Sequence, residues 1–127
     1  MRASKLYKKQ SLQTASKEQI TILLFRKALS NLNRLATGDW EEDQIAQFKL
    51  GENTLDILVE LRQTLNHDVA PELCRQLEDL YNYIIARLAV GLTTSDPTPF
   101  EDSIRTLEPI ADAFTTAAQQ VKEQSGP

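Results

Sequence analysis

The stretch SKEQITILLFRKALSNL, residues 16–32, decides the fold class. From Ile20 to Phe25 five of six residues are strongly apolar, and Leu29 and Leu32 continue the run at helical spacing. A surface helix needs only three or four apolar residues in every two turns to pack one face on a core. This stretch carries two neighbouring apolar rows. It therefore predicts a helix that is covered on more than one side.

Working outward, start and stop signals predict three more helices. Ser, Asp and Thr at positions 16, 39 and 98 are each followed three positions later by Gln or Glu, which is the spacing of a capping box at a helix start. The breaks TGD, NHD and TTSDP separate the predicted helices, so we expect helices at 16–36, at 39–65 and from Thr98 onward. Asp68 is the predicted cap of another helix at 68–92, and no segment alternates like a strand. Four helices with short connections predict an all-α fold, an antiparallel up-and-down four-helix bundle with an N-terminal arm or short extra helix.

The charges divide the chain into a basic start and an acidic body. Residues 1–36 contain eight Lys and Arg residues and one acidic residue, whereas the rest of the chain contains six Lys and Arg residues and seventeen Asp and Glu residues. We expect a flexible N-terminal arm at 1–13, a helical-bundle domain at 14–122 and a disordered tail at 123–127. Either the basic arm stays solvated, or it folds back on the acidic body as a lid.

Composition excludes several classes of function. The acidic body offers no basic surface for a phosphate backbone, so we expect no nucleic-acid partner. No apolar run is long enough to span a bilayer, and no signal peptide precedes the first helix, so we expect no membrane insertion. His67 and Cys74 are the only His and Cys, which argues against a metal site and a disulfide and fits a reducing compartment. We expect a cytoplasmic protein without a cofactor.

One enzymatic alternative rests on His67. Histidine phosphotransfer domains are four-helix bundles of this size, with a reactive His in mid-helix and Lys and Gly close after it. In this chain His67 stands in LNHDVAPE, at a predicted break between helices. No phosphate-binding loop or nucleophile motif is present. The sequence therefore predicts no enzyme, and the phosphotransfer domain is kept only as an alternative to be tested.

Four segments resemble one protein family in their order and spacing. They are Tyr7, TASKEQITILLFRKAL (14–29), GDWEED (38–43) and LEDLYNYIIARL (77–88). Together they resemble the FliS family of flagellar secretion chaperones, and the similarity covers residues 7–118. The Thr-Ala-Ser that opens the first of these helices is the most specific part.

The chain also departs from the family pattern. Lys17 replaces a proline, Arg26 and Lys27 replace an Asp-Gly pair, and DVAP (68–71) replaces a Gly-Gly turn. These changes do not alter the expected fold, but they affect the expected identity of the client. They favour, as the alternative, a divergent paralogue that is a helical-bundle adaptor or chaperone for a different client.

The resemblance implies a cytoplasmic export chaperone. Such a protein binds the disordered C-terminal segment of flagellin, prevents its premature polymerisation and holds it for flagellar export. The resemblance thus implies that the client segment folds into helix as it binds in an apolar groove of the chaperone. The flagellar export gate is a candidate second partner, and the protein itself is expected as a monomer or weak homodimer.

The surplus apolar rows of the first three helices are the predicted client site. One row of each helix is expected in the core, including Phe48 and Leu58 of the second helix, although a rotation would exchange the rows. The client-binding set is Ile22, Phe25, Leu29, Leu50, Ile57, Leu61, Tyr81 and Ile85. The resemblance adds that Tyr7 belongs to a segment able to occupy the client site, so the predicted lid uses Leu6, Tyr7 and Leu12.

Overall fold

The computed structural model describes the backbone of residues 2–94 and 96–124 and the side chains of residues 17–94 and 96–121. Its helices are α1 (Arg2–Thr37), α2 (Gln44–Gln63), α3 (Pro71–Thr94) and α4 (Thr98–Gln124). No strand occurs within these ranges. None of the described helices is both long and apolar enough to cross a membrane.

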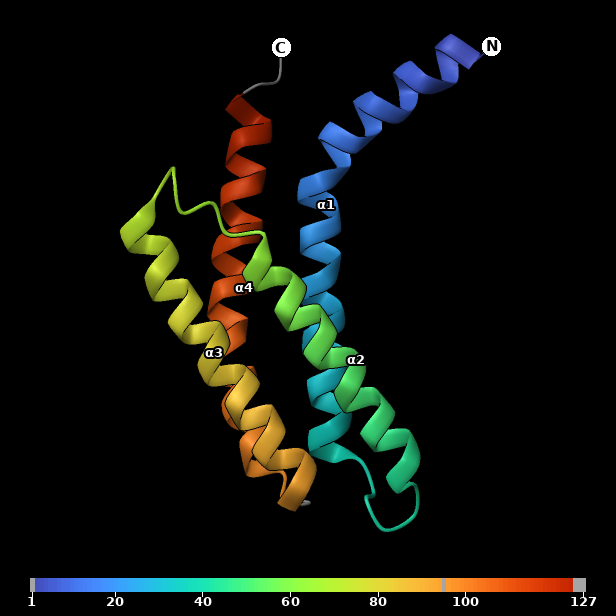
Figure 1. Cartoon of the computed structure of the whole chain (residues 1–127), viewed down its shortest axis with the longest axis vertical. Coiled ribbons are helices and arrows are strands. Elements are labelled where there is room, and N and C mark those ends of the chain that lie inside the picture. Colours follow the sequence, from blue (N-terminus) through green and yellow to red (C-terminus); the bar gives the residue numbers. More distant parts are fainter. Residues whose placement is uncertain (1, 95, 125–127) are drawn as a thin grey trace.

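Successive helices run in opposite directions (Figure 1). Helix α1 packs against α2 and α4, and α3 packs against the same two helices. Consecutive helices are therefore antiparallel neighbours, and the last helix, α4, packs against the first, α1. The predicted antiparallel up-and-down four-helix bundle is confirmed.

Every helix contributes to one apolar core. Aliphatic and aromatic side chains repeat at helical spacing on the inner side of each helix, and each fully buried one stabilises the fold by about 1.5–3 kcal/mol. The fully buried apolar residues include Leu32, Leu35, Leu58, Leu61, Ile84, Leu88, Phe100 and Leu107.

Three helix starts differ from the sequence prediction. Helix α1 begins at Arg2 rather than at Ser16. Helix α2 begins after Asp43, whose carboxylate accepts a hydrogen bond from the Ala46 amide at 3.3 Å. The predicted cap, Asp39, accepts instead from the amides of the next residues and closes a turn ahead of the helix.

Helix α3 begins later than predicted, at Pro71, and Asp68 does not cap it. Proline suits the first helical position because its missing N–H has no partner within the helix there. Ahead of it, Asn66 accepts a hydrogen bond from the Asp68 amide at 3.1 Å. His67 lies in this turn between α2 and α3, with Nε2 3.2 Å from an Oε2 of Glu78. It is therefore not placed in mid-helix, as a phosphotransfer histidine would be.

The opposite end of the bundle is closed by stacked rings. The Trp40 indole lies parallel to the Phe100 ring, with centroids 5.8 Å apart and an interplanar angle of 7°. Its Nε1 donates a hydrogen bond to the Leu35 carbonyl at 3.2 Å. On α3, a Cβ at Gly91 would lie 2.6 Å from a Phe100 ring carbon. Glycine at this position therefore lets the ring lie directly on the α3 backbone.

Candidate functional site

Two contacts show which sides of α2 and α3 face each other. Near one end, Arg62 donates a hydrogen bond to the Asn82 side chain at 2.7 Å. Near the other, a Cβ on Gly51 would overlap the Leu92 side chain. Residues at helical spacing from these contacts must lie along the same α2–α3 seam, because positions three or four apart share a helix side.

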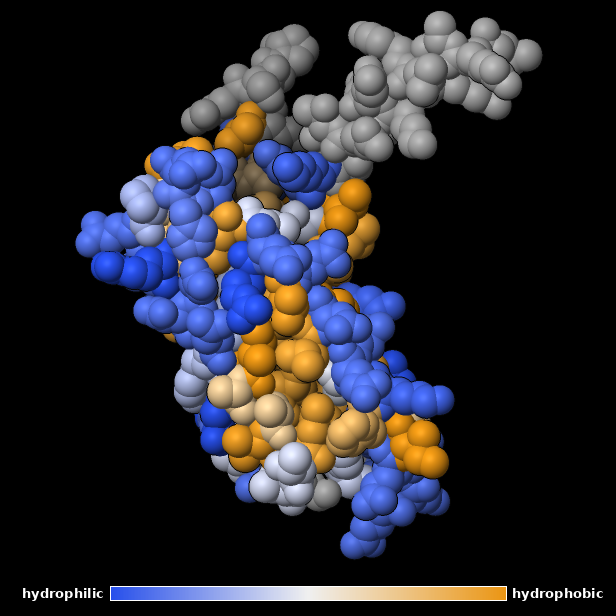
Figure 2. All heavy atoms as spheres, viewed as in Figure 1, coloured by the Kyte–Doolittle hydropathy of each residue, from blue (hydrophilic) through white to orange (hydrophobic). Residues whose placement is uncertain are grey.

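Most of the outer residues along this seam are apolar. They form what we call the α2–α3 face, made of Ile45, Phe48, Leu55 and Val59 with Ile85, Ala89 and Leu92. Ile45 is 73% exposed and Phe48 is 48% exposed, whereas Leu55, Ile85 and Leu92 are half-buried against the core. Figure 2 shows apolar side chains gathered between α2 and α3, in the half of the bundle next to the α1–α2 connection.

The α2–α3 face has the length of a short helix. Its residues on α2 extend over fifteen positions, or fourteen helical steps, from Ile45 to Val59. At about 1.5 Å rise per residue this is about 20 Å, or four helical turns. An amphipathic helix of similar length could lie along it with its apolar side inward.

A hollow lies at the end of this face. It has a volume of about 570 Å³, and we call it the Trp40 pocket. Its walls come from the α1–α2 connection, the first turns of α2 and the last turns of α3, and four of its eight lining residues are polar or charged. The lining residues are Trp40, Gln44, Ile45, Phe48, Lys49, Glu52, Leu92 and Thr93.

A second apolar strip follows the other side of α3. It consists of Leu73, Leu80, Tyr83 and Val90, each between 39% and 56% exposed. Arg87 stands between the last two and contacts α4, so the strip runs along the α3–α4 side. The α3 helix thus exposes apolar side chains on both of its flanks.

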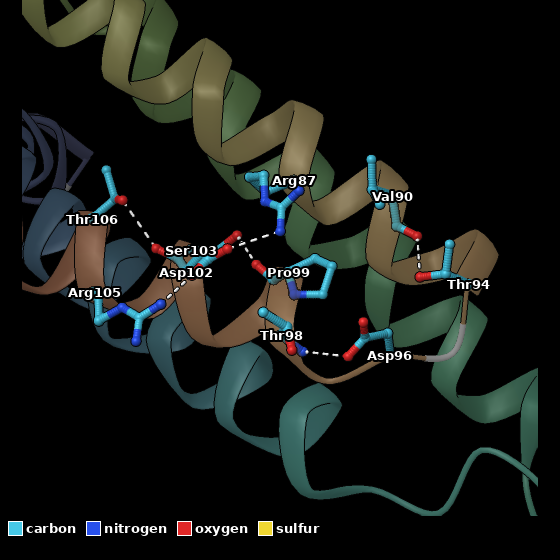
Figure 3. A network of polar contacts seen from close by, with 10 residues as sticks. All are labelled: Arg87, Val90, Thr94, Asp96, Thr98, Pro99, Asp102, Ser103, Arg105 and Thr106. Atoms are coloured by element: carbon cyan, nitrogen blue, oxygen red, sulfur yellow. Dashed lines mark hydrogen bonds and ion pairs between the residues drawn. The ribbon is translucent and has the colours of Figure 1, made fainter.

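Charged groups on the α4 side are engaged with one another (Figure 3). Arg87 donates to the Asp102 carboxylate at 2.8 Å, and Arg105 pairs with the other oxygen of the same carboxylate. The hydrogen bond from Arg87 holds the pKa of Asp102 below its usual range. A backbone hydrogen bond from Thr98 likewise lowers the pKa of Asp96. This network fastens α3 to the start of α4.

The structure distributes the predicted client-binding residues over several places. Ile85 lies on the α2–α3 face. Four others are buried in the core: Phe25, Ile57, Leu61 and Tyr81. Leu61 is as fully buried as Leu58, so the expectation that these two residues face different surroundings is wrong. Ile57, Leu58 and Leu61, which come from both predicted rows, thus share one buried arc of α2.

The remaining three predicted residues lie on other sides of the bundle. Leu50 borders a hollow between α1 and α2. Ile22 and Leu29 are half-buried on the side of α1 opposite Asn31, whose side chain bonds to Asn53 of α2 at 3.3 Å. The predicted set therefore does not form one surface, and its assignment to the client stays a prediction. The lid residues Leu6, Tyr7 and Leu12 lie outside the described side chains.

Sequence reasoning missed the most exposed members of the α2–α3 face. Phe48 was expected in the core, and Ile45 and Leu92 were not assigned to the site. Periodicity gave no signal for Phe48, because it belongs to the same predicted apolar row as Leu58, which the core does bury. Within the described residues no group of three His, Cys, Asp or Glu side chains could hold a metal ion.

Comparison with known protein families adds to this description. Residues 1–121 match the family described as flagellar protein FliS. A search of curated proteins gives no match. Since the family match spans nearly the whole chain, this protein belongs to the FliS family of flagellar proteins.

Proposed function

We propose that this protein binds the disordered C-terminal segment of flagellin in the cytoplasm and holds it for flagellar export. Membership of the FliS family implies the role of a flagellar export chaperone. The observation that supports a bound client segment is the α2–α3 face, an apolar surface of helical length that no described side chain covers. Soluble monomers seldom leave such a surface bare unless a partner covers it.

In this proposal the client folds as it binds. An apolar side of the segment becomes helical against Phe48, Leu55 and Ile85, which removes these side chains from water. The entropy lost in ordering the segment offsets much of this gain, so binding stays releasable without a nucleotide. Covering the client's apolar residues also blocks their use in premature polymerisation.

The other predicted residues enter the proposal in two ways. Leu50 is partly exposed on the adjoining α1–α2 side, whereas Ile22 and Leu29 are partly exposed on the opposite side of the bundle, so a client that contacts all three has to wrap around the protein. The four core residues of the predicted set contribute through the packing of the bundle, and Tyr81 lies one helical turn before Ile85 along α3. The protein acts as a monomer or weak homodimer, and the export gate is the proposed recipient of the loaded complex.

Calorimetric titration with the C-terminal segment of the host's flagellin tests this proposal. We expect Phe48→Glu and Ile85→Glu to weaken binding at least about tenfold, because each buries a charge against the client. Val69→Glu is the matched control, since Val69 is 78% exposed in the α2–α3 turn and lies off the face. Circular dichroism and thermal unfolding verify that each variant is folded. Unchanged binding by both face variants would place the client elsewhere.

A different client is the second candidate, and one observation favours it. Arg26 and Lys27 are exposed on α1 and form no ion pair among the described side chains. They replace an acidic position of the family pattern with two positive charges. If the wild-type protein does not bind flagellin at all, this candidate takes its place.

A further inference from the structure

The second apolar strip of α3, which we call the α3 strip, is symmetric in its spacing. Its exposed apolar residues are Leu73, Leu80, Tyr83 and Val90. They lie at equal distances on the two sides of a point between positions 81 and 82. A second copy of α3 that runs antiparallel and is centred on this point would place Leu73 opposite Val90 and Leu80 opposite Tyr83. Each pair would occur twice, as a two-fold axis requires.

The polar positions beside these residues fit the same pairing. Gln76 would lie opposite Arg87, whose side chain is still 29% exposed although it pairs with Asp102 of α4 (Figure 3). The carboxamide oxygen of glutamine can accept a hydrogen bond from a guanidinium, so this pair is compatible. Positions on the Asp102 side of α4 carry short side chains, namely Thr106, Pro109 and Ala113. Helix α4 therefore leaves room for a second copy to approach the strip.

Two opposite charges on α4 repeat about the same level. The contacts of Arg87 with Asp102 and of Gly91 with Phe100 place the centre of the α3 strip level with positions 108 and 109 of α4. Arg105 and Asp112 lie on either side of this level, and both are exposed. Residues seven positions apart share one side of a helix. In the antiparallel pair, Arg105 of each copy would therefore face Asp112 of the other.

We propose that the α3 strip binds the α3 strip of a second copy of this chain, in an antiparallel two-fold homodimer. Apolar residues then meet apolar residues at the centre, and opposite charges meet on the α4 side. The surface is thus complementary to itself, which is the condition for a two-fold interface. The α2–α3 face lies on the other flank of α3 and stays free for a client. The inference therefore goes beyond the proposed function and does not depend on it.

The size of this interface predicts a weak dimer. From Leu73 to Val90 the strip extends over seventeen helical steps, or about 26 Å. Together with the adjoining side of α4 it is about 20 Å wide, so the two copies would bury roughly 1,000 Å². Stable complexes bury about 1,200–2,000 Å². We therefore expect a dissociation constant above about 1 µM.

Sedimentation velocity of the full chain tests the dimer. Between about 5 µM and about 500 µM the average mass should rise from one copy toward two, because association follows mass action. Tyr83→Glu should weaken the dimer at least about tenfold, since it places a charge against the apolar Leu80 of the second copy. Phe48→Glu is the matched control, because Phe48 is 48% exposed on the α2–α3 face, and it should dimerise like the wild type. Circular dichroism verifies that each variant is folded.

An exchange of charges on α4 tests the antiparallel register. Arg105→Glu and Asp112→Arg, each made alone, should weaken the dimer at least about fivefold at low salt, because two attractive pairs become repulsive. The double variant with both substitutions should recover the wild-type affinity, since each new Glu again faces an Arg of the other copy. A double variant as weak as the single variants would overturn this register.

Three other outcomes would overturn the inference. The wild-type protein could remain a single copy over the whole concentration range. A dimer that Phe48→Glu dissociates and Tyr83→Glu does not would lie on the α2–α3 face. If Tyr83→Glu instead weakens the binding of the flagellin segment to a monomeric protein, the α3 strip belongs to the client. Loss of the dimer with unchanged flagellin binding is the result that we expect.

Discussion

Tyr81 shows how the core controls a single ionisable group. Its ring is 3% exposed between α3 and its neighbours, so a phenolate there would lose its hydration. This burial raises the pKa of Tyr81 to about 12. The neutral phenol is therefore the form that the folded bundle favours. The resulting stability is complete below pH 10, the ordinary pKa of tyrosine, and is lost as the pH rises from 10 toward 12.

Alkaline titration tests this assignment. The absorbance of tyrosinate near 295 nm should show a component close to pH 12 in the wild-type protein, and Tyr81→Phe should lack it. Urea unfolding between pH 9 and pH 11.5 should show a smaller loss of stability in Tyr81→Phe than in the wild type, since that variant has no phenol to ionise. The same loss in both proteins would contradict the assignment.

For single residues, the sequence predicts that a side chain is buried better than it predicts which side of the helix faces the core. Periodicity identifies Leu58 as a core residue, and the structure agrees. It does not separate Leu61 from Leu58, because positions three apart on a helix differ by only about 60° and a four-helix core covers a wider arc. Phe48 was misassigned for a related reason. Its side of α2 is apolar, but the core does not extend far enough to cover it.

At the scale of elements, local signals predict each helix but misplace several starts. Asp39 and Asp43 both satisfy capping chemistry, and the sequence alone cannot rank them. Trp40 decides between them through tertiary contacts. Its ring stacks on Phe100, which belongs to a helix almost sixty residues later, and this contact keeps residues 39–43 in a turn. Helix α2 consequently starts at Gln44.

The contact between α3 and α4 predicts an unusual response to Gly→Ala substitution. In an open helix this change stabilises by about 1 kcal/mol, because alanine is the better helix former. At Gly91 the new Cβ would lie 2.6 Å from the Phe100 ring, and Trp40 covers the other side of that ring. We therefore expect Gly91→Ala to destabilise the fold by about 1–3 kcal/mol through overpacking.

Gly51→Ala is the comparison for this prediction. Its Cβ would meet only the end of the Leu92 side chain, which is half-buried at the edge of the Trp40 pocket and has room to move. Urea unfolding of both variants should show a clearly larger loss for Gly91→Ala. A Gly91→Ala protein as stable as the wild type would mean that the ring stack is not the constraint we describe.

For the whole molecule, the order and connection of the helices determine more than any single motif. Four capped helices and short turns were enough to predict the antiparallel bundle, because short connections force consecutive helices to lie side by side. The site was less predictable. A surface such as the α2–α3 face depends on how far two helices diverge from the core, and that distance depends on pairs such as Gly51 and Leu92 rather than on periodicity.

The charge division along the chain leads to a prediction about the first twelve residues. They contain four Lys and Arg residues and no acid, whereas the chain beyond residue 36 has a net charge of −11. Leu6, Tyr7 and Leu12 add apolar groups to this basic segment. In the structure the backbone of this segment continues α1 away from the α1–α2 connection (Figure 1). We expect it to leave that helical path when no client is present, to fold back over the α2–α3 face and so to compete with the client.

Deleting residues 1–12 should then tighten client binding. The gain equals the inverse of the fraction of open molecules, so an arm closed nine-tenths of the time gives about tenfold. Tyr7→Ala should give a smaller gain, and the pair Lys5→Gln and Lys8→Gln should give one that disappears near 0.5 M NaCl. Calorimetric titration with the flagellin segment measures all three, with Arg75→Gln as the control for loss of an exposed positive charge outside the arm. Weaker binding after truncation would make the arm part of the client site, and unchanged binding would leave it a solvated extension.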